Sequence, residues 1–153
     1  MMEIATSLGQ LDIDQLANVY EQTLEQSGDF LLAYQDFIAG TQAFFEEPAA
    51  FYALWSVDGR YVSALRVEPY NGGWLIAGLE TAPISRYKGY AKALLSGVLE
   101  YLPEGSKVYS HVDKDNITSL AVHAACGFMK ELDHAVYLNG SVSNHGCTLS
   151  RII

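Results

Sequence analysis

One segment of the chain combines a glycine-containing turn with three basic side chains. It runs from Leu79 to Leu95, with Gly89 between an apolar stretch and a second stretch that has helical periodicity. A helix that begins directly after such a turn leaves its first backbone N–H groups unpaired, at the positive end of the helix dipole. Groups of this kind bind phosphate or pyrophosphate. The segment is therefore the first candidate for the chemistry of this chain.

Gly89 is central to this candidate anion site because it has no Cβ to keep a bulky anion away from the backbone. We expect the N–H groups from Tyr87 to Ala91 to hold two phosphates, with Ala91 small enough to pack beneath the ligand. Positive charge at the rim would come from the side chains of Arg86, Lys88 or Lys92. The alternative is a tight connection in which the glycine is purely structural.

The residues before this site predict two helices followed by three strands. Apolar residues at helical spacing indicate one helix from Asp12 to Ser27, with Asp12 helping to cap it, and a second from about Asp29 that ends before Pro48. Aromatic and β-branched runs, with a hairpin signal between the first two, then predict strands at Phe51–Val57, Tyr61–Val67 and Trp74–Thr81.

The residues after the site predict alternating helices and strands. An apolar stripe from Ala91 to Leu102 indicates a helix that stops at Pro103. A strand at Lys107–Val112 leads to a helix capped by Asp115 or Asn116 and closed by Gly127. Two last strands are expected at Glu131–Leu138 and Gly146–Ile152. Because no repeat or linker divides the chain, we expect one mixed α+β domain over residues 1–153.

The composition excludes several classes of protein. Half of the 153 residues are apolar and 18% are charged, as in folded globular domains. We expect no membrane span and no signal peptide. Cys126 and Cys147 do not form a metal-type pair, so no metal is expected. These features predict a cytoplasmic protein in which both thiols are reduced. The net charge of −9 argues against a nucleic-acid partner. It suits a cationic amine substrate, and equally it suits ordinary solubility.

A second motif follows the glycine turn. The run from Asn116 to Phe128 begins with a possible helix cap, continues through the small residue Ser119 and ends in Gly-Phe. Together with Arg86-Tyr87-Lys88-Gly89-Tyr90-Ala91 it resembles the GNAT superfamily of acetyl-CoA-dependent N-acetyltransferases, whose signature is Arg or Gln, two residues, Gly, one residue, then Gly or Ala. The resemblance covers roughly residues 50–138, and a predicted strand separates the two motifs as the family requires.

The resemblance implies a fold and an acetyl donor. The fold would be a GNAT-like α+β domain with a central, mostly antiparallel twisted sheet flanked by helices, in which a splayed strand pair holds acyl-CoA. Acetyl-CoA would be the donor, with its pantetheine arm paired to the strand before the turn, and homodimers are common among relatives. The cofactor-binding residues implied in this way are Leu79, Glu80, Thr81, Arg86, Tyr87, Lys88, Gly89, Tyr90, Ala91, Lys92, Asn116 and Ser119.

The resemblance also implies catalytic residues. A base must take the proton of the attacking amine, and we favour Glu80, at the carboxyl end of its strand, over His111. The family usually has a tyrosine proton donor five residues before the Phe of the Gly-Phe ending, and that position is His123 here. Since His123 lies four residues after Ser119, we expect its side chain on the cofactor side of the helix, donating a proton to the leaving thiolate. The alternative is a helix residue without a role in the reaction.

Three functions remain open on the sequence. The first is an acetyltransferase that acts on a primary amine of a small molecule or peptide by direct attack in a ternary complex. The second is a non-catalytic acyl-CoA-binding or regulatory module, and the third is a small α+β binding domain with a structural glycine turn. No motif identifies the acceptor. The aromatic-rich segment from Tyr34 to Tyr52 would line its pocket or, as such residues more often do, form core.

Overall fold

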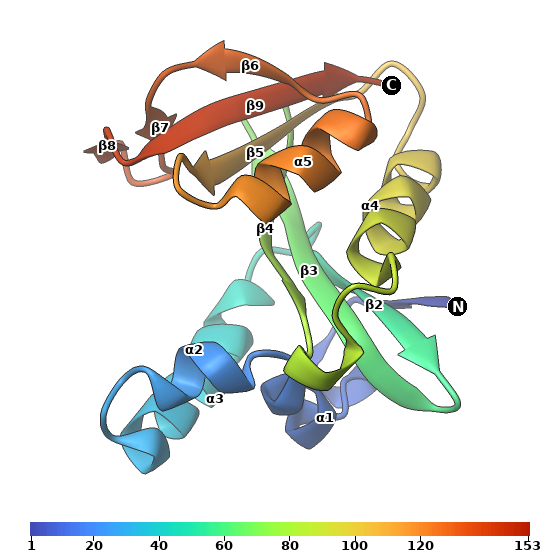
Figure 1. Cartoon of the computed structure of the whole chain (residues 1–153), viewed down its shortest axis with the longest axis vertical. Helices are drawn as coiled ribbons and strands as arrows, with labels where there is room; N and C mark the ends of the chain where they lie inside the picture. The colour runs from blue at the N-terminus through green and yellow to red at the C-terminus, as the bar shows by residue number, and fades with distance from the viewer.

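In the computed structural model, which describes all residues 1–153, a seven-stranded sheet runs through the whole chain (Figure 1). Its strands stand in the order β1-β2-β3-β4-β5-β9-β6, and every neighbouring pair is antiparallel except the parallel pair β4–β5. The strands are β1 (Met2–Ala5), β2 (Phe51–Val57), β3 (Arg60–Tyr70), β4 (Gly73–Thr81), β5 (Lys107–Asp113), β6 (Met129–Leu132) and β9 (Gly146–Ile152). A small ribbon of β7 (Ala135–Val136) and β8 (Val142–Ser143) lies apart from the sheet.

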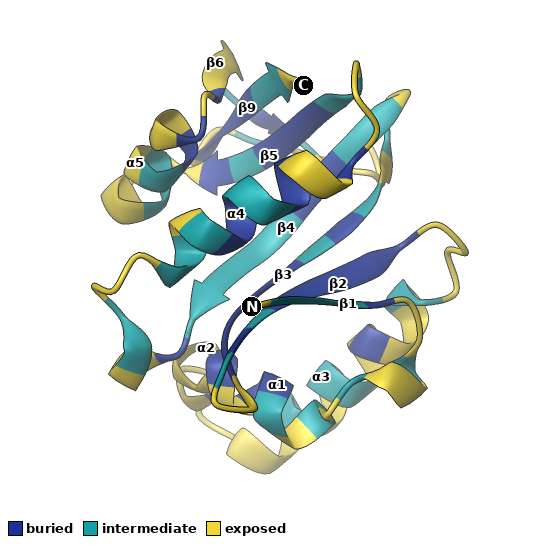
Figure 2. Cartoon of the chain, turned by 90° about the vertical axis from the view of Figure 1, so that its right-hand side faces the viewer, coloured by how far each residue is buried: buried dark blue, intermediate teal, exposed yellow.

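The helices cover both faces of the sheet. On one face lie α1 (Ile13–Val19), α2 (Glu21–Glu25) and α3 (Phe30–Phe44), and on the other lie α4 (Tyr90–Tyr101) and α5 (Ile117–Ala125) (Figures 1 and 2). Short 3-10 turns at Leu8–Gln10 and Pro83–Ser85 precede α1 and α4. The mixed α+β fold with a mostly antiparallel sheet, expected from the sequence, is confirmed.

Two hydrophobic clusters follow from the alternation of side chains along the strands. Leu65 and Val67 of β3 face α4 and belong to the larger cluster. Ala64, on the opposite face of β3, belongs to a smaller cluster with Leu16 and Tyr20. The aromatic residues Phe37, Phe44, Phe45 and Tyr52 pack in or against this smaller cluster, so they form core.

The pairing between β4 and β5 ends early. It covers only Trp74↔Val108, Leu75↔Tyr109 and Ile76↔Ser110, although β4 continues to Thr81. The pairing of β4 with β3 shifts register beside Gly78, whose φ of +64° is readily adopted only by glycine. The resulting β-bulge turns the last part of β4 away from β5 and opens a gap between the two strands.

Two predicted elements differ from the structure. The helix expected from Asp12 to Ser27 is two helices, because Tyr20 leaves the helical conformation and donates a hydrogen bond from its buried hydroxyl to the Gly78 carbonyl at 2.5 Å. The strand expected at Glu131–Leu138 is divided between β6 and β7, which pair with different partners. Asp133 lies at the break and forms ion pairs with Lys114 and Lys130.

The edge strand β1 was not predicted from the sequence. It has only four residues and pairs along one side with β2. Its apolar contact is with the sheet and with α4, where the Met2 sulfur lies against Gly97. A strand this short is specified by its neighbours and not by its own alternation.

We expect Gly73→Ala to destabilise the protein, because an added Cβ would collide with the backbone oxygen of Lys107 where β4 and β5 begin to pair. The expected loss in the free energy of unfolding is about 1–3 kcal/mol, measured by urea denaturation. Gly40→Ala is the control: it lies in α3 with open space around it, so it should stabilise the helix. Equal stabilities for the two variants would contradict the close approach at Gly73.

Candidate active site

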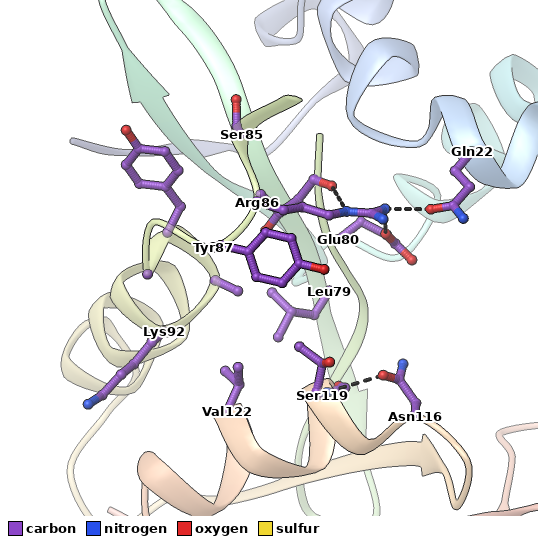
Figure 3. A pocket seen from close by; sticks show the side chains of 15 residues that line it. Gln22, Leu79, Glu80, Ser85, Arg86, Tyr87, Lys92, Asn116, Ser119 and Val122 are labelled. Carbon is purple, nitrogen blue, oxygen red and sulfur yellow. Dashed lines mark hydrogen bonds and ion pairs between the residues drawn. The ribbon is translucent and has the colours of Figure 1, made fainter. Parts of the chain in front are cut away.

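A cavity of about 410 Å³ opens between the end of β4, the N-terminus of α4 and the first turns of α5 (Figure 3). It lies beside the gap between β4 and β5. Its walls contain all the cofactor-binding residues expected from the sequence except Lys88, whose side chain is exposed elsewhere. Four further wall residues were not predicted from the sequence: Gln22, Ser85, Thr118 and Val122. Gln22 comes from α2, and no local pattern connects it with this site.

The N-terminus of α4 is uncapped by any side chain. Gly89 is the N-cap with φ +80°, and the first backbone hydrogen bond runs from Ala93 N–H to Gly89 O. The N–H groups of Tyr90, Ala91 and Lys92 precede that bond and have no partner. A Cβ built on Gly89 would meet no protein atom within 4 Å, and residues 89–92 all line the cavity, so this helix end opens onto it. The helix end can therefore receive an anion.

The side chain of Arg86 is directed away from this helix end. Its Nε donates to Thr81 O at 3.2 Å, and its Nη2 donates to Gln22 Oε1 at 2.7 Å and lies 3.7 Å from Glu80 Oε2 (Figure 3). Arg86 thus ties the loop to the end of β4 and to α2. Of the other basic residues expected at the rim, Lys92 belongs to α4 itself and lines the cavity.

The opposite wall is the start of α5. Asn116 caps this helix, since its side-chain oxygen accepts a hydrogen bond from Ser119 N–H at 3.1 Å. Thr118, Ser119 and Val122 also line the cavity. Asn116 is therefore both a helix cap and a wall residue, which the sequence left possible.

Glu80 lies in the cavity wall with its side chain about one-third exposed. Burial raises the pKa of its carboxyl, and the nearby charge of Arg86 opposes that rise. Its backbone is also held in place, because Ser63 Oγ donates to Glu80 O at 2.7 Å. A carboxylate with a raised pKa at the end of β4 is suited to accept a proton.

His123 does not lie where the sequence predicted. Its side chain is 1% exposed and packs against Phe128 in the core, not in the cavity. Its Nδ1 donates to Ser119 O at 2.7 Å, so its Nε2 accepts from Ser110 Oγ at 2.9 Å. Burial lowers its pKa, which favours the neutral ring. The helical spacing predicted that His123 shares the cofactor side of the helix with Ser119. Instead, α5 turns residues 119 and 122 to the cavity and residue 123 towards β5.

His111 lies on the other face of the sheet, in the wall of a second cavity. Thr148 donates its hydroxyl proton to His134 O, so it accepts from His111 Nδ1 at 2.9 Å. The Nε2 atom is buried without a hydrogen bond, although the Val136 carbonyl lies near the ring. Burial lowers the pKa of this imidazole. The structure thus separates His111 from the Glu80 cavity.

A splayed parallel strand pair beside an uncapped helix is the arrangement that the resemblance implied for an acyl-CoA-binding fold. The chain belongs to the GNAT acetyltransferase family, because the sequence model of that family matches residues 12–128. A sequence comparison with curated proteins gives no significant match. No group of three or more His, Cys, Asp or Glu side chains is placed to hold a metal ion. None of the helices has the length and apolar character that a membrane crossing requires.

Solved structures share the fold at low sequence identity. The ribosomal-protein-alanine N-acetyltransferase of Brucella melitensis has 16% identity and a TM-score of 0.68 over 100% of this chain and 99% of that one. The PaiA N-acetyltransferase of Thermoplasma acidophilum, solved in complex with coenzyme A, has 12% identity and a TM-score of 0.67 over 100% and 99%. A GNAT-family acetyltransferase of Streptococcus pneumoniae has 14% identity and a TM-score of 0.68 over 100% of both chains.

The buried neutral His123 should make stability depend on pH. Its pKa is lowered in the folded protein from the ordinary value of 6.5, so the unfolded chain binds the proton more readily as the pH falls below that value. We expect the stability advantage of the wild type over His123→Gln to shrink between about pH 7.5 and about pH 5. Urea denaturation at each pH measures it. The exposed His145 supplies the control His145→Gln, and a constant difference for His123→Gln would contradict the buried neutral ring.

Proposed function

We propose that this chain, as one domain over residues 1–153, transfers an acetyl group from acetyl-CoA to a primary amine of a small molecule or peptide. The observation that carries this proposal is one cavity that joins two features beside the β4–β5 gap: the end of β4, which has no strand partner on its β5 side, and the uncapped start of α4. The fold neighbour from Thermoplasma acidophilum, which contains coenzyme A, supports acyl-CoA as the ligand class.

The walls of the cavity suit the parts of an acyl-CoA. The pyrophosphate would accept hydrogen bonds from the N–H groups of Tyr90, Ala91 and Lys92, since these have no protein acceptor. The pantetheine arm, which carries amide groups, would pair with the backbone of residues 79–81, where β5 no longer does. Asn116 and Ser119 would contact the arm from the opposite wall.

Glu80 is the proposed general base. The amine nitrogen attacks the thioester carbonyl carbon, Glu80 takes the proton that the nitrogen loses, and the carbon–sulfur bond breaks to release CoA thiolate. Arg86, at 3.7 Å, keeps the carboxylate in place, while partial burial keeps its pKa above the ordinary range. His111 is a second candidate, because it lines the cavity on the other face and its buried Nε2 makes no hydrogen bond.

His123 is not proposed as the proton donor to the thiolate. Both of its ring nitrogens have protein partners, and its ring is neutral and buried. The positive end of the α5 dipole stands at the cavity instead, where Asn116 and Ser119 lie. That dipole would stabilise the leaving thiolate without a proton donor.

Gly89→Glu should weaken acetyl-CoA binding by at least about tenfold, because a carboxylate would occupy the space in front of the α4 N–H groups. Titration calorimetry measures the affinity. Gly89→Ala is the matched control, since it carries the same strain at φ +80° without the charge or the length. Wild-type affinity in Gly89→Glu would remove the pyrophosphate from this helix end.

Glu80→Gln should lower kcat by about a hundredfold or more while acetyl-CoA binding is retained. In the wild type, kcat/KM should fall as the pH drops through the raised pKa of Glu80, above its ordinary 4.5, because the base must be unprotonated. This fall in kcat/KM at low pH should disappear in Glu80→Gln. The release of free thiol with a panel of amines measures the loss in kcat and the pH dependence of kcat/KM. His111→Gln is the parallel variant. A larger loss in His111→Gln than in Glu80→Gln would move the base to His111.

Thiol release and titration calorimetry together distinguish the alternative functions. A protein that binds acetyl-CoA and releases no thiol with any amine would be a non-catalytic acyl-CoA-binding module. A protein that gives no saturable heat with acetyl-CoA would have a purely structural glycine turn.

A further inference from the structure

The second cavity adjoins the first along β4. Residues 75–78 of β4 line the second cavity and residues 79–81 line the first. Because Leu65 and Val67 face α4, the alternating residues Arg66 and Glu68 project from β3 on the opposite face, into the second cavity. The remaining walls come from β5 and from the segment that follows β7. A molecule in this cavity would approach the β4–β5 gap from the side away from α4.

Arg66 is placed at the point where the two cavities meet. A Cβ built on Gly78 would stand 2.9 Å from Arg66 Nη1, so the guanidinium lies directly against the bulge of β4. The same Cβ would stand 3.2 Å from the Tyr20 hydroxyl. The charges of Arg66 and Glu80 both act on that hydroxyl, whose pKa burial raises. The cation of Arg66 therefore lies against Gly78, two residues before the proposed base Glu80 on β4.

The guanidinium of Arg66 has no partner in the protein. The ion pairs of the chain are Arg86–Glu80, Lys107–Glu131, Lys114–Asp133 and Lys130–Asp133. Arg66 takes no part in them, and none of the side-chain hydrogen bonds involves it. Burial raises the pKa of the neighbouring Glu68, and the charge of Arg66 opposes that rise. The Glu68 carboxylate and the Arg66 guanidinium nevertheless do not come within ion-pair distance. A half-buried arginine without an anion, in a chain of net charge −9, is unusual.

We propose that the acceptor carries a carboxylate close to its reacting amine, and that Arg66 binds this carboxylate. The inference rests on the proposed acetyl transfer and names the substrate class for it: an amino acid or a compound that resembles one. The planar guanidinium offers parallel N–H donors that match a carboxylate. Apolar side chains of the same cavity, those of Leu75, Tyr137 and Leu138, would contact an apolar substituent of the acceptor.

A purely cationic amine fits this cavity less well. The acidic composition of the chain favours cations in general, and Glu68 lines the same wall. The Arg66 guanidinium, however, lies against the bulge and forms no ion pair in the protein, so it would repel a positive charge on the acceptor. A carboxylate removes that repulsion and gives Arg66 the partner that it lacks.

The test compares matched acceptors in the thiol-release assay. Phenylalanine carries the carboxylate, phenylalaninamide replaces it with a neutral amide, and phenethylamine lacks it. We expect kcat/KM for phenylalanine to exceed both others by roughly ten- to a hundredfold, as the loss of a charged hydrogen-bond partner predicts. A broader panel of amino acids and their decarboxylated amines covers the case in which another apolar substituent is preferred.

Arg66→Ala should remove that preference. The variant should lose roughly ten- to a hundredfold in kcat/KM for the carboxylate-bearing acceptor, mainly through KM, and leave the amine without a carboxylate unchanged or improved. Arg66→Lys should recover part of the loss because it keeps the charge but not the parallel donors. Arg60→Ala, an exposed arginine on the same strand, is the matched control and should behave as the wild type. Acetyl-CoA affinity and thermal midpoint report whether each variant is folded.

The outcomes separate this inference from the proposed function. Turnover that is equal or faster with the amines that lack a carboxylate would overturn the role of Arg66 and leave acetyl transfer standing. The same holds if Arg66→Ala loses activity equally on all acceptors. Acetyl-CoA binding without thiol release from any amine would overturn both. Selective loss on carboxylate-bearing acceptors in Arg66→Ala alone is the result that supports the inference.

Discussion

The arrangement of the site depends on the early end of the parallel pairing between β4 and β5. The two strands separate after Ile76 and Ser110, and the bulge at Gly78 turns the rest of β4 away. A sheet strand that loses its neighbour leaves backbone groups that need partners. In this fold those groups lie at the edge of a cavity, so an extended ligand can take the place of the missing strand. The start of α4 then supplies the unpaired N–H groups at one end of the same cavity.

The bulge also connects β4 with the N-terminal helices. Tyr20 donates to Gly78 O from the face covered by α1, α2 and α3, and this contact coincides with the break between α1 and α2. Arg66 lies against the same residue. Because Gly78 has a positive φ and stands close to both the Tyr20 hydroxyl and the Arg66 guanidinium, this one position connects the course of β4 with α1 and α2 and with Arg66. Small changes there should therefore affect both cavities.

Much of the fold could be predicted because local patterns agree with the tertiary structure. The hairpin β2–β3, the stripe of α4 and the Asn116 cap depend on nearby residues and appear as expected. The division of the first helix at Tyr20, the short β1 and the separation of β6 from β7 depend on partners far away in the chain. Periodicity carries no information about such partners, so these elements were missed or merged.

The sequence by itself determined the family, the glycine turn and most of the segments that border the first cavity, because a turn, a cap and a helix start are specified within a few residues. Only the tertiary structure decided which side chains face that cavity. It turned His123 into the core, tied Arg86 to Glu80 and Gln22, and set Arg66 and His111 around a second cavity. The physical reason is that the orientation of a side chain depends on strand register, a bulge and helix rotation, which are fixed by packing between distant segments.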